Sequence, residues 1–554
     1  MTKNTRRIYI ILVLTAGLYP GALKAQTVDA STMRYKVMAG YQGWFRTPGD
    51  TPDNQGWAHL FKTSSPSPEK LAFDTWPDMS EMSEKEKYPA PGFTYADGRQ
   101  AYLYSAQNYQ TVLRHFQWMR NYDIDGVWLS EFCGHFPGGG SQYDSTAVLH
   151  IMQNVRKAAK ETGRTWAFMW DMSGFGRQMS KESVYAIITN QWKKMVEEGV
   201  TSDDRYLHEN GKPVLLIWGF FPGRPASQPD YMNPVIDFLQ AKGKYQATLI
   251  AGVDPNWRAL GTPEFQSMLM RMQGLQPWSV GRRVTDPSTG YAVQNTSAWS
   301  EDIRMCEANH VMFMPVLNAG THIAGPPPPN HVPTVPRRTG NYLWEQYVVA
   351  SKFHLNSAFL AMFDEINEGT QMMKIDINPP VQAPFFTYDG ATSDYYLRLA
   401  GAGARLLREN KPIDPVIPVN PFDPQKWYHI RNQANGMLLT AGNAQLLTAS
   451  LKDGDNHQLW QIEMAGAGIF CFKNKYDGRV LWIDHANAQL TKPQKNVAWP
   501  VSMEWRLEWD GSGACRIIAK NSSQAICIAS KEEYGVVVSG DKPLDEYRWQ
   551  IIPQ

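Results

Sequence analysis

The 554-residue chain has almost no excess charge and few cysteines. Its 54 basic and 53 acidic residues leave a formal net charge of +1. This balance argues against nucleic acid or another strongly charged partner, since an electrostatic footprint needs clustered excess charge. Five cysteines cannot all pair within one chain and are too scattered for a disulfide framework. No Cys or His pair has zinc-ligand spacing, so we expect neither a metal nor another cofactor.

After the N-terminal segment the chain has no long apolar run. None there approaches the roughly 20 residues that are needed to cross a bilayer. The N-terminus itself has Lys3, Arg6 and Arg7, then an apolar run over 8–18 and small residues that end at Ala25. This order of charged, apolar and small residues predicts a secretory signal peptide, residues 1–25, without the Cys of a lipoprotein anchor. We therefore expect an exported protein, periplasmic or extracellular, with no membrane span.

The chain is too long for one ordinary domain, and its first part alternates strand and helix patterns. Eight short apolar runs lie at 37–43, 124–129, 166–172, 213–218, 247–252, 275–280, 311–316 and 359–363. Helix-period segments separate them, including 148–159, closed by Gly163, and 184–195, closed by Gly199. Eight parallel strands that alternate with helices close most naturally into a (β/α)8 TIM-type barrel, expected over 26–410.

Catalytic groups of such barrels lie after the carboxyl ends of the strands, where this chain has polar and aromatic residues. The substrate-binding candidates at these positions are Tyr41, Trp44, Trp128, Glu131, Trp170, Asp171, Trp218, Asp254, Trp278 and Asn318. Flat aromatic faces with a polar edge suit carbohydrate rings, although each could equally be a core residue. His59 joins them because its turn-rich stretch, 47–68, should cover the barrel mouth; a surface histidine without a catalytic part is the alternative.

Two glutamates follow the last predicted strand. Glu365 and Glu368 lie three residues apart, directly after the apolar run 359–363. A turn of that length can aim both carboxyl groups into one cleft, where they can divide general-acid and general-base work. The alternative is that the acids cap a following helix or pair with basic neighbours.

Prolines recur every three residues at Pro412, Pro415, Pro418, Pro421 and Pro424. This interval predicts a semi-rigid extended linker over 411–425 with few contacts across it, and so a domain boundary.

Beyond the linker the chain repeats itself three times. The units open at Asn432, Asn474 and Asn521 with similar residues, and they close at Trp460, Trp505 and Trp549, which are 45 and 44 residues apart. This pattern resembles the ricin-B-type β-trefoil, which implies an all-β, carbohydrate-binding-like domain over 426–554. Only the first unit keeps the Gln-x-Trp form, so 455–460 is the best candidate for a glycan contact there.

Four segments of the first domain resemble glycoside hydrolase family 99 and its relatives near family 71, which act on α-mannans and α-glucans. The segments are 37–45, 125–128, 211–214 and, above all, 365–371. The family's motif is similar to Asn-Glu-Trp-His-Glu-Gly-Thr-Gln. Both glutamates and the Gly-Thr-Gln end match, whereas Asp364, Ile366 and Asn367 stand where the family has Asn, Trp and His.

The resemblance implies a glycoside hydrolase that cleaves an α-linked glycan, α-mannan-like or related, with retention. Glu365 would take a proton from the sugar's own 2-hydroxyl, which attacks the anomeric carbon to give a 1,2-anhydro sugar. Glu368 would protonate the leaving oxygen and should therefore have a raised pKa. Two alternatives remain open: a non-catalytic glycan-binding protein on a hydrolase scaffold, and another mechanism in which Glu131 or Asp171 is the partner acid.

Overall fold

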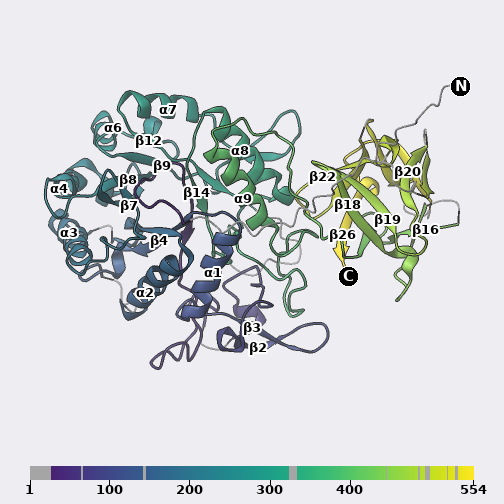
Figure 1. The fold of residues 1–554 in the computed structure, drawn as a ribbon, viewed down its shortest axis with the longest axis horizontal. Coiled ribbons are helices and arrows are strands. Elements are labelled where there is room, and N and C mark those ends of the chain that lie inside the picture. Colours follow the sequence, from purple (N-terminus) through teal and green to yellow (C-terminus); the bar gives the residue numbers. More distant parts are fainter. Residues whose placement is uncertain are drawn as a thin grey trace, which may run out of the picture.

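The structure is a computed structural model with a larger N-terminal unit and a smaller C-terminal unit (Figure 1). It describes residues 27–63, 66–140, 145–176, 178–322, 334–443, 446–484, 487–492, 500–520, 522–530 and 535–554. The predicted signal peptide, 1–25, and Asn521 lie outside these residues.

The larger unit is built on a parallel, TIM-like sheet. In chain order its strands are β1 (Val37–Tyr41), β4 (Gly126–Phe132), β5 (Thr165–Asp171), β7 (Lys212–Phe220), β8 (Thr248–Val253), β9 (Gly274–Pro277), β12 (Met312–Phe313), β13 (Val316–Asn318) and β14 (Ala358–Ala361). β1 pairs with both β4 and β14, so the first and last strands are neighbours. β12 pairs with β9 and β13 pairs with β14, so the short segment 312–318 joins the two ends of the sheet path.

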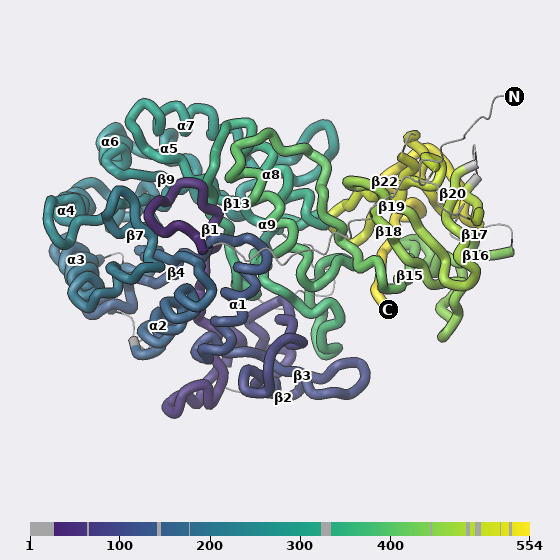
Figure 2. The backbone as a smooth tube through the Cα atoms, in the orientation of Figure 1, coloured from purple at the N-terminus to yellow at the C-terminus, as the bar shows by residue number. Residues whose placement is uncertain are grey.

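Helices separate these strands and cover the outside of the sheet (Figure 2). They are α1 (Tyr109–Asn121), α2 (Ser145–Thr162), α3 (Lys181–Glu197), α4 (Pro229–Gln240), α5 (Trp257–Leu260), α6 (Pro263–Leu269), α7 (Trp299–Ala308), α8 (Asn341–Lys352) and α9 (Tyr395–Arg408). The predicted helices before Gly163 and Gly199 are confirmed as α2 and α3, and both glycines have a positive φ, 68° and 69°. Within the described ranges, no helix has the length and apolar character that a membrane span requires.

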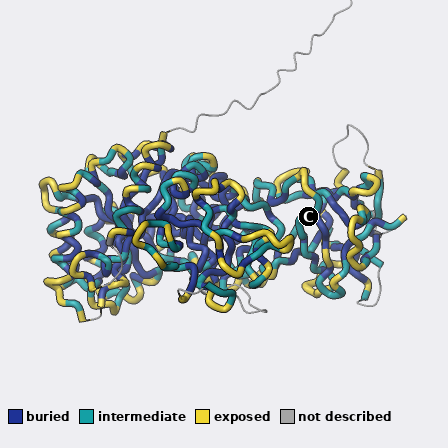
Figure 3. The backbone as a smooth tube through the Cα atoms, turned by 90° about the horizontal axis from the view of Figure 1, so that it is seen from below, coloured by how far each residue is buried: buried dark blue, intermediate teal, exposed yellow. Residues whose placement is uncertain are grey.

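Apolar strands explain where the core lies. The residues of β1, β5, β8, β9 and β14 are all buried, as expected for parallel strands covered on both faces. Figure 3 shows the buried segments running through the middle of the larger unit. Three small additions lie outside the parallel set: the hairpin of β2 (Tyr88–Thr94) and β3 (Gln100–Leu103), β6 (His208–Glu209) beside β7, and the pair β10 (Arg283–Thr285) and β11 (Ala292–Gln294).

The smaller unit is all-β. Its strands are β15 (Tyr428–Asn432), β16 (Leu438–Ala441), β17 (Leu446–Ala449), β18 (Trp460–Gly466), β19 (Ile469–Asn474), β20 (Val480–Asp484), β21 (Asn487–Thr491), β22 (Trp505–Trp509), β23 (Cys515–Ala519), β24 (Gln524–Ile528), β25 (Val536–Gly540) and β26 (Arg548–Pro553). All their pairings are antiparallel.

The three closing tryptophans of the repeat occupy equivalent places in this unit. Trp460, Trp505 and Trp549 are fully buried. Their indole N–H groups donate to the carbonyls of Leu439, Leu481 and Ile526 at 2.9, 3.3 and 3.0 Å. A repeated contact of this kind follows from the repeated sequence, while the β-trefoil topology itself stays a prediction.

The proline-rich segment lies against the larger unit instead of standing free. Ile413 is buried and its N–H donates to Ser351 Oγ, and the Trp344 indole donates to the carbonyl of Asp414. Farther along, Arg398 donates to the carbonyl of Asn420 at 2.7 Å. A proline-rich chain has many carbonyls that its own backbone does not use, so side chains of α8 and α9 can bind them. These contacts join the segment to the larger unit, and the domain boundary at 411–425 stays a prediction.

Candidate active site

Asp364 ties the loop after β14 to the end of β1. Its carboxylate accepts the backbone N–H groups of Gln42 at 2.9 Å and Gly43 at 2.8 Å. Burial raises the pKa of Asp364 to about 6, and these two hydrogen bonds oppose the rise. The loop that carries the two glutamates is therefore anchored at its first residue.

Glu365 is buried and its carboxylate has two donors. Oε1 accepts from the Gln42 amide at 3.1 Å and Oε2 accepts from Thr370 Oγ1 at 2.8 Å. Burial, and then the charge of Glu368, raise the pKa of Glu365 to about 8. The two donors pull in the opposite direction because they stabilise the charged form.

Glu368 has different surroundings. It is half-buried, and among the described residues no donor binds its carboxylate. Burial raises its pKa, and the nearby carboxylate of Asp74 adds to the rise. The rise expected from the sequence is thus present, but a third acid contributes to it, and Glu365 shows a rise as well.

Side chains from distant parts of the chain hold the peptide groups around Glu368. The carbonyl of Glu368 accepts from the backbone N–H of His322 at 2.7 Å and from the side chain of Thr321, through Oγ1, at 2.9 Å. The His322 ring nitrogen Nδ1 lies 2.9 Å from Asp74 Oδ2. Next to it, Arg337 donates through Nη2 to the carbonyls of Gly369 and Gln371.

Sequence reasoning missed Asp74, His322 and Arg337 as site residues. No spacing or motif marks them, because Asp74 and the connection between β13 and α8, which contains His322 and Arg337, come to the glutamates only through the fold. The one signal near them was the proline-rich segment 322–338, which contains His322 and Arg337 and which the sequence marks as a stiff piece that could wall one end of a cleft.

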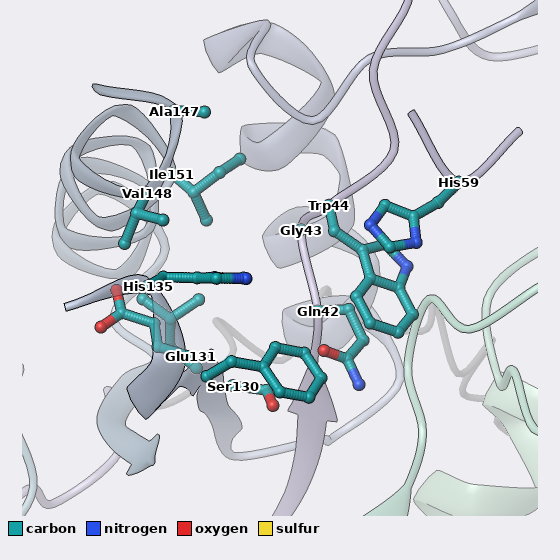
Figure 4. A pocket seen from close by; sticks show the side chains of 12 residues that line it. Gln42, Gly43, Trp44, His59, Ser130, Glu131, His135, Ala147, Val148 and Ile151 are labelled. Carbon is teal, nitrogen blue, oxygen red and sulfur yellow. The ribbon is translucent and has the colours of Figure 1, made fainter. Parts of the chain in front are cut away.

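A cavity of about 310 Å³ opens beside this loop, and Gln42 is part of its wall (Figure 4). Figure 4 shows Trp44 and His59 on one side and Glu131 and His135 on the other. The Trp44 ring stacks on His59, with ring centroids 4.1 Å apart and an interplanar angle of 8°. Because Gln42 also binds Glu365, the cavity and the glutamate pair share one residue.

The titratable groups of this cavity favour their neutral forms. Burial raises the pKa of Glu131 to about 8. Burial, and then the charge of His135, lower the pKa of His59 to about 4, and burial also lowers that of His135. Near neutral pH the cavity therefore presents an acid, two imidazoles and a tryptophan edge without net charge, which suits a neutral ligand.

The remaining predicted residues divide between the mouth and the core. Trp218 and Trp278 are half-buried and their ring centroids lie 5.5 Å apart. Asp171 and Asp254 are buried and cap turns, because their carboxylates accept the N–H groups of Ser173 at 2.6 Å and Asn256 at 2.8 Å.

Four predicted binding residues lie within the packed interior. Tyr41 is fully buried and its hydroxyl lies 3.0 Å from His115 Nδ1. Trp128, Trp170 and Asn318 are also buried. None of the four lines the cavity described above. Their burial favours the alternative role of core residues, even for Tyr41 and Asn318, which are the last residues of β1 and β13.

No protein-family model matches the chain, and no curated protein matches it. Among solved structures, it is similar to the GH99 endo-alpha-mannosidase from Bacteroides thetaiotaomicron, at 16% identity and a TM-score of 0.49 over 68% of this chain and 99% of that chain. Another match is the designed 3-fold symmetric protein ThreeFoil, at 18% identity and a TM-score of 0.21, over 23% and 97% of the two chains. A third is a GlcNAcα1-4Gal releasing endo-β-galactosidase from Clostridium perfringens, at 22% identity and a TM-score of 0.21, over 26% and 35%.

Gly369 provides a test of how tightly this loop is packed. Its φ is +64°, and a Cβ at this position would lie 2.3 Å from Nδ1 of His322, which Asp74 holds in place. We expect Gly369→Ala to lower the free energy of unfolding by about 2–4 kcal/mol, the sum of backbone strain and overpacking. Gly290→Ala is the matched control, since φ there is +73° and no atom lies within 4 Å. Equal losses in urea denaturation would contradict this packing.

The raised pKa of Glu365 predicts a pH-dependent difference in stability. Its pKa is about 8 in the folded protein against an ordinary 4.5, so the folded state keeps a proton that the unfolded state has lost. The stability from this group is therefore complete below about pH 4.5 and is lost as the pH rises towards 8.

Glu365→Gln stays neutral and avoids this loss, so its stability relative to wild type should increase between pH 5 and 9. Thermal unfolding of both proteins at several pH values measures the difference. Glu301→Gln, at an exposed site paired with Arg304, serves as the control. A difference that does not change with pH would show that Glu365 is not held neutral by burial.

Proposed function

We propose that the protein is an exported glycoside hydrolase that cleaves an α-linked glycan, α-mannan-like or related, with retention. The observation that carries this proposal is a pair of carboxyl groups on one loop after a parallel strand, Glu365 buried and Glu368 half-buried, with unlike surroundings. Two acids in different environments can act as base and acid at the same pH.

The surroundings favour one division of roles. The Glu365 carboxylate accepts two hydrogen bonds, which suits the charged form that a base needs. Glu368 lies near the charge of Asp74, which suits the protonated form that an acid needs. In the free protein burial keeps a proton on Glu365 as well, with a pKa of about 8, so the proposed reaction begins once that proton is lost and the remaining proton is on Glu368.

In the proposed reaction Glu365 takes the proton of the sugar's 2-hydroxyl, and the 2-oxygen attacks the anomeric carbon. The bond from that carbon to the leaving oxygen breaks while Glu368 protonates the leaving oxygen. The 1,2-anhydro sugar is then opened by water, which Glu368 deprotonates as Glu365 returns its proton to the 2-oxygen. Each displacement inverts the anomeric carbon, so the product retains the original configuration.

The uncharged cavity beside Gln42 supports a neutral sugar as the ligand. Trp44 offers a flat edge, and Glu131, with a pKa of about 8, can donate a hydrogen bond as a neutral acid. Asp171 is less suited to be a second catalytic acid, because its carboxylate is occupied by the Ser173 N–H.

A glycan contact in the C-terminal unit is part of the proposal. In its first repeat the His457 ring lies 3.7 Å from the exposed ring of Tyr476, measured between centroids. Asp455 holds His457 through Nδ1 at 2.7 Å. The exposed ring of Tyr476, oriented by the half-buried His457, offers a flat surface to a sugar ring.

The catalytic roles predict large losses of turnover. Glu365→Gln and Glu368→Gln should each lower kcat by about 10²- to 10⁴-fold, because each removes a proton-transfer step and conserves shape. The assay is product release from a panel of α-mannans, α-glucans and plant polysaccharides, with Glu409→Gln, an exposed glutamate, as the control. Near-wild-type turnover in either variant would remove that glutamate from the mechanism. Binding of a glycan by the wild type without any turnover would favour the non-catalytic alternative.

The mechanism also predicts the stereochemistry. The product first formed from an α-linked substrate should be the α anomer, since two inversions occur at one carbon. Proton NMR of the anomeric signals, recorded before mutarotation, distinguishes the two anomers. A first-formed β anomer would exclude the route through the 2-hydroxyl.

A further inference from the structure

Arg337 is a buried arginine between the glutamate loop and the C-terminal unit. We propose that the C-terminal unit holds the loop 364–371 in its working geometry through Arg337, which makes Arg337 a positioning residue. This inference rests on the proposed function of the loop. It also differs from the expectation of two separable domains, because the smaller unit becomes a support of the site.

On the side of the loop, Arg337 binds two peptide groups. Its Nη2 donates to the carbonyl of Gly369 at 2.8 Å and to that of Gln371 at 2.9 Å. These carbonyls flank Thr370, whose hydroxyl donates to Glu365, and Gly369 directly follows Glu368. One guanidinium therefore restrains the peptide groups on which both glutamates depend.

The guanidinium is itself held in place by aromatic rings. Its carbon lies 5.1 Å from the ring centroid of Tyr388 and 4.5 Å from that of Tyr396. Tyr388 is fixed in turn, because its hydroxyl donates to the carbonyl of Met373 at 2.7 Å. Arg337 cannot change its position without disturbing this packing.

On the other side, the turn between β22 and β23 touches the residues next to Arg337. A Cβ at Gly511 would lie 2.5 Å from Cβ of Pro336, the residue before Arg337. A Cβ at Gly513 would lie 3.1 Å from Oδ1 of Asp389, the residue after Tyr388. The backbone of the C-terminal unit thus lies against the residue before Arg337 and the residue after Tyr388.

Charged groups of the two units also interact at this contact. Burial raises the pKa of Asp389 to about 6, the charge of Arg337 opposes the rise, and Asp510 of the C-terminal unit adds to it. Arg337 therefore balances a carboxylate that the C-terminal unit covers. Asp389 is half-buried beside that unit, so removal of the unit would expose it further to water and weaken its interaction with Arg337.

A hydrogen bond between the two units shows that they meet in a defined orientation. Arg516 of β23 donates through Nη2 to the Tyr291 hydroxyl at 3.1 Å. The same guanidinium is oriented by Glu508 at 2.7 Å and Asp541 at 2.6 Å. An arginine fixed by two carboxylates is a directional contact, unlike a mobile surface pair.

The test compares full-length Arg337→Met with Arg338→Met. The two arginines are adjacent and both buried, but Arg338 donates to Glu345 and to the carbonyl of Ala292 instead of the glutamate loop. Hydrogen–deuterium exchange of peptides that cover 364–373 is the primary measurement, because it does not require activity. We expect faster exchange in this segment for Arg337→Met alone, with partial recovery in Arg337→Lys, whose ammonium can donate to one carbonyl.

The contribution of the C-terminal unit is tested by Gly511→Val against Gly454→Val. Both glycines have a positive φ, +87° and +72°, but only Gly511 faces another residue, and Gly454 has no atom within 4 Å. Gly511→Val should accelerate exchange over 364–373 and Gly454→Val should not. If Gly511→Val does not fold, Gly511→Ala provides the same contact with one methyl group. Unchanged exchange in the Arg337 and Gly511 variants would overturn the proposal.

Kinetics separate this proposal from the proposed function. If wild type hydrolyses a glycan, Arg337→Met should lower kcat roughly 10- to 100-fold with little change in KM. Its alkaline limb of kcat/KM should also move to lower pH, because water that enters the loop reduces the burial that raises the glutamate pKa values. If wild type has no activity, the proposed function fails, and the exchange measurements still decide whether Arg337 couples the two units.

Discussion

The hydrogen bonds from the backbone N–H groups of Gln42 and Gly43 to the Asp364 carboxylate are the contact on which the site depends. They join the ends of β1 and β14, the first and last strands of the parallel set. A buried carboxylate needs such donors, because burial without them costs several kilocalories per mole. Once Asp364 is bound, Glu365 follows along the loop and reaches the Gln42 amide, which in turn faces the cavity.

Burial then decides the chemistry of the acids. Four carboxyl groups, those of Glu131, Asp364, Glu365 and Glu368, have raised pKa values, and burial is the main cause for each. The acids differ in their hydrogen-bond partners. Asp364 and Glu365 each accept two hydrogen bonds, whereas Glu368 lies close to Asp74. The arrangement is typical of sites where neutral and charged acids act together.

The two units share more than a linker. The proline-rich segment is packed on α8 and α9, and the turn between β22 and β23 lies against Pro336 and Asp389. Such contacts hold the smaller unit in a defined position relative to the larger unit. The turn of the smaller unit lies against Pro336, and the next residue, Arg337, binds the carbonyl of Gly369 in the glutamate loop.

The sequence by itself determined the features that local patterns encode. Apolar runs and helix periodicity predicted the parallel strands and the helices α2 and α3, and the sequence repeat placed Trp460, Trp505 and Trp549, all buried in the structure, at equivalent ends of three units. The loop with Glu365 and Glu368 was also evident, since both acids lie within one turn. Only the tertiary structure decided which strand-end aromatics reach the cavity, as Trp44 does and Trp128 and Trp170 do not. It alone brought Asp74, His322 and Arg337 to the loop, because burial, hydrogen bonding and charge depend on neighbours that lie far apart along the chain.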